Sequence, residues 1–186
     1  AIGFVYGDDE AIKWRSLQGK NFTQDGAART LWGIEKLEPN AKEIIIVEGE
    51  ADVLACATAS IKNAVSVPNG APQKVSNRRV DPSEDKKFGY VWEAKSEIEA
   101  ADRIVLCVDN DEPGEALAEE LARRIGRAKC YRVQWPNGCK DANDALINLG
   151  AEKLRELIAE AEAMPLQGVY SADEYGGDIA DLYEQG

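Results

Sequence analysis

Carboxylates follow two apolar runs of the sequence, at the point where each run stops. Residues 44–47 lead into one acidic string and residues 105–108 into a second, and a helical pattern follows each string. The acids of the two strings are Glu48, Glu50, Asp52, Asp109 and Asp111. Such apolar runs are typical of parallel strands covered on both faces, and parallel sheets bind their ligands beyond the carboxyl ends of the strands. The acids are therefore expected at the active edge of a sheet.

Three of these acids meet if the two strands are neighbours. Glu48, Asp109 and Asp111 then share one small volume, where like charges raise each other's pKa unless a cation compensates them. The chain contains no His, and its four cysteines show no CxxC spacing. The available ligands are hard oxygens, which favour magnesium or manganese over zinc. The strings therefore predict one or two Mg²⁺ or Mn²⁺ ions, and no zinc in this chain.

A third polar string supports this interpretation, although a single string has an ordinary alternative. Asp109 and Asp111 taken alone could simply end a strand and cap a helix. Lys140, Asp141 and Asp144 follow another predicted strand, so that acids occur at successive strand ends of one sheet. Lys140 could contact a phosphate or be a solvated surface lysine. The combination of three strings favours a metal site.

The composition limits the class of protein. With 186 residues, the chain is long enough for one domain with a sizeable core and a small appendage. Its net charge of −12 argues against a generic nucleic-acid-binding surface, so a polyanion must be bound locally, through metal and a few basic clusters. No apolar stretch approaches the roughly 20 residues of a membrane span and no leader is recognisable, which predicts a cytoplasmic protein without a membrane partner. The cysteines are expected to be reduced core thiols.

The remaining pattern predicts an α/β fold in three parts. Residues 1–38 indicate a small antiparallel β subdomain, and residues 39–163 a parallel sheet of about four strands with flanking helices. Residues 164–186 are acidic and are predicted to be a linker, with one short helix near 179–183. Strands are expected over 43–47, 64–67, 103–108 and 129–135, and helices over 52–60, 93–101, 113–126, from 145 onward, and over 151–163.

Two stretches carry basic residues. Around residues 12–15 a period of two puts Lys13 and Arg15 on one strand face, with Lys20 after the next turn; the alternative is a merely solvated face. Residues 71–92 form a long polar stretch, either a functional insert that holds a nucleic-acid backbone or a mobile loop. Its cations are Lys74, Arg78, Arg79, Lys86 and Lys87.

The acidic strings resemble the Toprim domain, which primases, topoisomerases and some nucleases share. The likeness covers about residues 41–150 and rests on EGEAD at 48–52 and DNDEPG at 109–114. In detail the chain is similar to the primase half of the phage-type primase-helicases and of their mitochondrial relative Twinkle, also through VPNGA at 67–71 and CKDAN at 139–143. The resemblance implies a Toprim, Rossmann-like sheet preceded by a small basic subdomain.

The resemblance also implies the function of a DNA primase core, which makes short RNA primers on single-stranded DNA by metal-dependent nucleotidyl transfer during replication. Glu48, Asp109 and Asp111 would be catalytic and would hold the metal together with Asp141. Glu48 would be either a ligand or the base that receives the hydroxyl proton. The residues expected to bind nucleoside triphosphates are Lys13, Arg15, Lys20 and Lys140. Additional acids of the site by position are Glu50, Asp52 and Asp144, of which Asp52 could equally be a helix-capping acid.

The expected partners follow from the same resemblance. Phage-type primases carry a zinc-binding domain in front of this core and a hexameric helicase behind it, and neither pattern occurs in this sequence. The chain also begins without Met. We therefore expect a monomeric piece of a longer protein, from the cytoplasm of a bacterium or phage-infected host, that uses a single-stranded DNA template and nucleoside triphosphates.

Two alternatives stay open. A Toprim nuclease would use the same acids to hydrolyse a phosphodiester with water, although the basic segment around Lys13, Arg15 and Lys20 disfavours it. A topoisomerase fragment is less favoured, because the flanking sequence does not match. A non-catalytic DNA-binding or helicase-coupling module would result from a decayed site, but none of the principal acids is missing.

Overall fold

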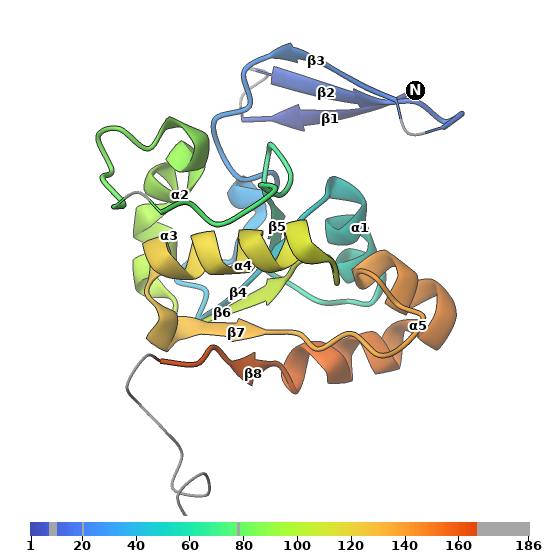
Figure 1. Ribbon diagram of the computed structural model, residues 1–186. Coiled ribbons are helices and arrows are strands. Elements are labelled where there is room, and N and C mark those ends of the chain that lie inside the picture. Colours follow the sequence, from blue (N-terminus) through green and yellow to red (C-terminus); the bar gives the residue numbers. More distant parts are fainter. Residues whose placement is uncertain (8–10, 20, 78, 167–186) are drawn as a thin grey trace, which may run out of the picture.

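The computed structural model describes residues 1–7, 11–19, 21–77 and 79–166, and it confirms the predicted α/β class. A five-stranded sheet with helices on both faces is accompanied by a separate three-stranded antiparallel sheet (Figure 1). The large sheet has the order β5-β4-β6-β7-β8, with strands β4 Glu43–Val47, β5 Ala64–Ser66, β6 Arg103–Cys107, β7 Cys130–Arg132 and β8 Glu162–Ala163. The first four strands are parallel, as predicted, and β8 pairs with β7 in the antiparallel sense.

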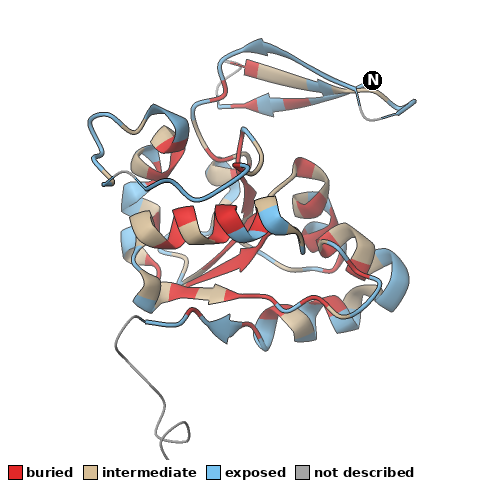
Figure 2. Cartoon of the chain, in the orientation of Figure 1, coloured by how far each residue is buried: buried red, intermediate tan, exposed pale blue. Residues whose placement is uncertain are grey.

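The apolar runs are buried on both faces, which is why they lack the alternation of a half-exposed strand. On β4, Ile44 and Ile46 belong to one core and Ile45 and Val47 to the other. The central strands of the sheet are coloured as buried in Figure 2. The first core contains side chains of α2 (Gly89–Glu93), α3 (Lys95–Ala100) and α4 (Glu112–Ile125). The second contains side chains of α1 (Glu50–Thr58) and α5 (Ala142–Ala159). The two helical layers hold the central strands rigidly.

The start of α4 fixes the second acidic string. The Asp111 side chain caps this helix by accepting the backbone N–H of Gly114 at 2.9 Å, and Pro113 lies in the first turn. A Cβ at position 114 would lie 2.0 Å from the carbonyl oxygen of Asp109, so only glycine fits. The spacing from Asp111 to the glycine is thus required by the close approach of the turn to the helix.

The small sheet has the order β1-β2-β3, with β1 Ile2–Tyr6, β2 Ala11–Arg15 and β3 Phe22–Gly26. It confirms the predicted antiparallel meander. Its inner face carries the buried Phe4, Tyr6 and Ala11, together with Lys13. Trp32 then exchanges backbone hydrogen bonds with Ser66 at 2.9 and 3.1 Å and so joins the connecting segment to β5.

Several predicted boundaries differ from the structure. Helix α1 begins at Glu50, two residues earlier than expected, and β7 is shorter than predicted. The last helix was expected to reach residue 163, which was wrong, because α5 stops at Ala159 and β8 follows. Within α5, Gly150 has a non-helical φ of 87° and divides the helix in two. Residues 71–92 contain the 3₁₀ turn Lys86–Phe88 and all of α2 except its last residue, Glu93. Lys20, Arg78 and residues 167–186, with their predicted short helix, lie outside the described residues.

The cysteines and the apolar helices bear on two expectations from the composition. All four cysteines are free and buried, as predicted, and burial raises the pKa of Cys56 to about 12. Among the described residues, no helix combines the length and the apolar character needed to cross a membrane.

Candidate active site

The two strands that end in acids are direct neighbours. β4 pairs with β6 in parallel, with Val47 opposite Cys107. Glu48 leaves β4 one residue beyond this pair and Asp109 leaves β6 two residues beyond it. The prediction that the acids lie close together required β4 and β6 to be neighbours, and they are.

Glu48 is a partly buried carboxylate with one unused oxygen. Its Oε1 accepts the backbone N–H of Ala71 at 3.3 Å, whereas Oε2 is buried and has no hydrogen-bond partner among the described residues. Burial and the charge of Asp109 raise the pKa of Glu48 to about 6. A buried carboxylate oxygen without a donor is costly, and a nearby cation would remove that cost.

Asp109 and Asp111 share the ammonium group of Lys140. Lys140 Nζ donates to Asp109 Oδ2 and lies 3.4 Å from Asp111 Oδ2. Burial raises the pKa of the Asp109 carboxyl, and Lys140 opposes that shift. Asp111 caps α4 through Oδ1, which is the ordinary alternative that the sequence left open, and its Oδ2 faces the ammonium group of Lys140.

Backbone contacts bring these loops together. The N–H of Asn110 donates to the carbonyl oxygen of Lys140 at 2.8 Å. The buried Arg132 of β7 donates to the carbonyl oxygens of Val108 at 2.9 Å and Asp109 at 3.0 Å. Arg132 was not predicted as a site residue. Its signal in the sequence was a charged residue inside an otherwise apolar strand, where it must satisfy buried carbonyl groups.

Asp52 and Asp141 extend the acidic edge toward α5. Asp52 is 7% exposed, and its Oδ1 accepts the N–H of Asn143 at 3.1 Å. Burial and the charge of Asp141 raise the pKa of Asp52 to about 7. Asp141 caps α5 by accepting the N–H of Asp144 at 2.8 Å. We call Glu48, Asp52, Asp109, Asp111 and Asp141 the acid cluster.

A cleft of about 560 Å³ separates the acid cluster from the small sheet. Glu48, Asp109 and Asp141 line one wall. The other wall is formed by Lys13, Arg15, Phe22 and Gln24. The structure thus places two of the predicted nucleotide-binding residues, Lys13 and Arg15, opposite the predicted catalytic acids.

The far wall combines cations with an exposed aromatic ring. Phe22 is 52% exposed, and Lys13 Nζ and the Arg15 guanidinium carbon each lie 5.5 Å from its ring centroid. The sequence analysis missed Phe22 and Gln24. They could have been found from the strand register, since Arg15 pairs with Phe22 and Lys13 with Gln24 on the same face.

Glu50 connects the two walls. It is 3% exposed; its Oε1 lies 2.8 Å from Lys13 Nζ and accepts a hydrogen bond from the Tyr6 hydroxyl. Burial and this hydrogen bond raise the pKa of Tyr6. Glu50 therefore holds the small sheet against the start of α1, and it also lines the cleft.

The donor set fits a hard divalent cation. The edge offers carboxylate oxygens, one of them without a hydrogen-bond partner, and a lysine ammonium already lies between Asp109 and Asp111. In the ranges that the structure covers, no three acid, His or Cys side chains are yet grouped closely enough to hold one ion together. An ion at this edge would therefore compete with Lys140 for the two aspartates.

Residues 42–134 match the Toprim domain family. The match covers half of the chain and includes Glu48, Asp109 and Asp111. The chain belongs to the Toprim family.

Within the Toprim family, the chain is similar to three proteins whose names refer to Twinkle or to primases. The chain is 41% identical to the chloroplastic/mitochondrial Twinkle homolog protein of Arabidopsis thaliana, over 99% of this chain and 27% of that protein. It is 42% identical to the Primase homolog protein of Arabidopsis thaliana, over 89% of this chain and 52% of that protein. A solved bacteriophage T7 structure, in which lagging-strand DNA polymerase interacts with primase domains bound to an RNA/DNA hybrid and dTTP, matches with a TM-score of 0.65 and 25% identity, over 83% of this chain and 72% of that chain. This chain spans about a quarter and about half of the two Arabidopsis relatives.

Proposed function

We propose that the chain is the catalytic core of a DNA primase, which synthesises short RNA primers on a single-stranded DNA template by metal-dependent nucleotidyl transfer. The observation that carries the proposal is the cleft, where the Toprim acids face a wall of cations and an exposed aromatic ring. A nucleoside triphosphate needs metal and cations for its phosphates and an apolar face for its base. The names of the two relatives and the nucleotide and hybrid in the T7 structure support the same activity.

In the proposed reaction a 3'-hydroxyl attacks the α-phosphate of a nucleoside triphosphate and releases pyrophosphate. Glu48, Asp109 and Asp111, with Asp141 beside them, would hold one or two Mg²⁺ or Mn²⁺ ions, which supply charge neutralisation of the triphosphate. Arg15 binds phosphate from the opposite wall. Lys140 exchanges its two aspartates for a phosphate oxygen, since its side chain is half exposed.

Glu48 has two candidate roles. Its pKa of about 6 suits a base that accepts the hydroxyl proton near neutral pH. Its unpartnered Oε2 suits a metal ligand. A Glu48→Gln variant that keeps the Mg²⁺-dependent rise in Tm but loses synthesis identifies the base; a variant that loses both identifies the ligand.

The domain division and partners belong to the same proposal. Residues 1–38 form the nucleotide-contacting subdomain, residues 39–163 the catalytic domain, and residues 164–186 the linker toward a helicase. Lys20, which lies outside the described residues, is proposed to bind nucleotide as well. The full-length protein would add a zinc-binding domain that reads the template and the helicase. Analytical ultracentrifugation of this chain tests the expected monomer.

The location of the protein is a separate question. The sequence predicted the cytoplasm of a bacterium or phage-infected host, whereas the name of the Twinkle homolog places that relative in chloroplasts and mitochondria. We propose an organellar location as the alternative supported by this relative. A fluorescent fusion of the full-length protein distinguishes the two compartments.

The activity is tested by incubating the chain with Mg²⁺, a single-stranded DNA template and labelled ribonucleotides, with and without a template-reading zinc module. Short RNA products that require both template and metal are expected, and Asp109→Ala should make none. The same DNA without nucleotides reports cutting. Cleavage without synthesis would establish the nuclease alternative, and absence of both activities, with no metal-dependent stabilisation, would establish the non-catalytic module.

A further inference from the structure

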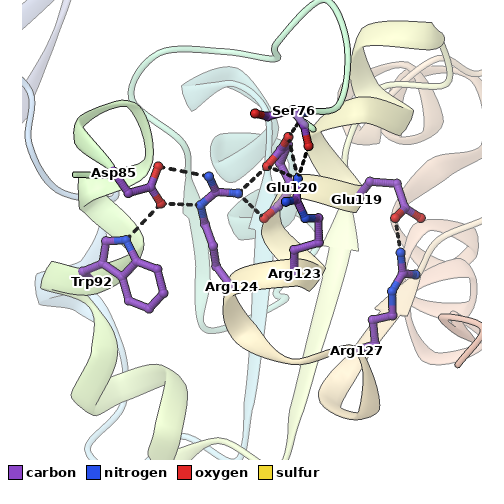
Figure 3. Close-up of polar contacts among 8 residues, drawn as sticks. All are labelled: Ser76, Asp85, Trp92, Glu119, Glu120, Arg123, Arg124 and Arg127. Atoms are coloured by element: carbon purple, nitrogen blue, oxygen red, sulfur yellow. Dashed lines mark hydrogen bonds and ion pairs between the residues drawn. The ribbon is translucent and has the colours of Figure 1, made fainter. Parts of the chain in front are cut away.

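The stretch 71–92, which the sequence left as an insert or a mobile loop, is anchored on α4 at Ser76 and Asp85. The buried Glu120 accepts the N–H of Ser76, and Arg123 Nη1 donates to the Ser76 carbonyl oxygen at 2.6 Å (Figure 3). Arg124 donates to both oxygens of Asp85, at 2.6 and 3.0 Å. We call Asp85, Glu120, Arg123 and Arg124 the charge network. It fixes the residue that follows Asp85.

That residue, Lys86, borders a second hollow, which we call the lateral groove. The groove has a volume of about 560 Å³. It lies between the segment after β3 and the start of α2, and it shares Gln24 and Asn69 with the cleft at the acid cluster. The lateral groove therefore adjoins the cleft, and a polymer held at the acids can extend into it.

The charge of the lateral groove is suited to a polyanion. Arg29 and Lys86 are exposed on its lining, and neither forms an ion pair with a described residue. Glu93 is the one acid among the described lining residues. In a chain with a net charge of −12, two unpaired cations beside the same hollow form a local binding site for phosphates. A third hollow beyond Lys86 adds Arg79 and Lys87 but also Asp81 and Glu84, so the cations that it adds are matched by acids.

We propose that the lateral groove binds the sugar–phosphate backbone of single-stranded DNA on its way to or from the cleft, with Arg29 and Lys86 each contacting a phosphate. This inference rests on the proposed function, because it assigns the strand as the template. The charge network is a positioning device in this proposal, since it holds Lys86 without contacting the DNA. Single-stranded DNA is favoured over a small anion because the lateral groove adjoins the cleft in which polymerisation is proposed.

The test compares two double variants that remove the same charge. Arg29→Gln/Lys86→Gln neutralises the lateral groove, and Lys62→Gln/Lys153→Gln neutralises two exposed lysines elsewhere that pair with Glu38 and Glu156. The affinity for a fluorescein-labelled oligothymidylate is measured by anisotropy over a range of salt concentrations. Loss of two phosphate contacts should flatten the plot of log K against log salt by about 1.4 and weaken binding about 25-fold near 0.1 M salt. The control should keep the wild-type slope.

The outcomes for the lateral groove and for the proposed function are separable. Equal slopes of log K against log salt for the two double variants would overturn the proposal that the lateral groove binds DNA, even if the wild type makes primers. A flattened slope confined to Arg29→Gln/Lys86→Gln supports the groove, even if the wild type makes no primers and the proposed function is wrong. Both double variants should have the Tm of the wild type, because all four substituted residues are exposed. If the Tm of Arg29→Gln/Lys86→Gln is lowered, the single variant Lys86→Gln replaces it, with an expected change of slope of about 0.7.

Discussion

The acid cluster and the charge network are both made of buried or partly buried charges, but they are balanced differently. In the charge network, Asp85 and Glu120 each pair with an arginine, and Arg124, whose side chain is 5% exposed, bridges them (Figure 3). In the acid cluster, Lys140 is the cation that pairs with the aspartates, and it serves two of them at once.

The pKa shifts follow this difference. Burial would raise the pKa of Asp85, but the guanidinium of Arg124 holds it below its usual range. Burial and neighbouring acids instead raise the pKa of Glu48 to about 6 and that of Asp52 to about 7. Matched charges fix the position of a segment, whereas an excess of one sign costs stability and persists where a ligand supplies the missing charge.

The largest effect is expected from removing an acid of the cluster. Asp109→Ala should reduce primer synthesis about a thousandfold or more, because a bound metal supplies several kcal/mol of charge stabilisation. Its free energy of unfolding should stay at or above the wild-type value, since a repelling carboxylate is lost. Product formation on gels and urea unfolding measure the two quantities. Retained synthesis would remove Asp109 from the site.

Removing an acid of the charge network should have the opposite pattern. Glu120→Gln leaves the buried Arg124 with one partner fewer and should lower the free energy of unfolding by about 3 kcal/mol. Glu119→Gln is the matched control on the same helix, because its partner Arg127 is more exposed, and it should cost less than about 1 kcal/mol. Similar losses in the two variants would show that the network is not fixed by its buried charges.

Magnesium should stabilise the folded protein only by binding to the acid cluster. At a concentration about a hundredfold above Kd, Mg²⁺ should add about 2.7 kcal/mol to the free energy of unfolding of the wild type. Glu120→Gln should keep this gain from a lower starting stability, and Asp109→Ala should lose it. Thermal melts with and without Mg²⁺ measure the difference; an equal gain in all three proteins would place the ion elsewhere.

A further prediction concerns the dependence of stability on pH. Because the pKa of Asp52 is raised from 3.8 to about 7, the folded protein retains a proton that the unfolded chain has lost, and the free energy of unfolding falls as pH rises through this range. Asp52→Asn cannot titrate there but can still accept the Asn143 N–H, so its stability should fall less over the same range. Urea unfolding at several pH values tests this, and parallel curves for both proteins would contradict the assigned pKa.

Much of the fold and part of the site follow from local sequence. The runs at 44–47 and 103–108 predicted strands because both faces of each strand are apolar, and Pro113 and Gly126 marked the limits of α4 within a residue or two. Strand β8 escaped prediction because two exposed residues carry no periodicity. Its pairing with β7 depends on where α5 ends.

The sequence by itself determined which residues carry charge, where each string of acids follows a strand, and that oxygen donors would outnumber any other ligand. The tertiary structure decided which charges are neutralised. Glu50, predicted among the acids of the site, is satisfied by Lys13 and Tyr6, whereas Glu48, two residues away, keeps an oxygen without a partner. The reason is physical, since the pKa and the ligand-binding capacity of a carboxylate depend on burial and on the groups within a few ångströms, which neighbouring strands and loops supply from distant parts of the chain.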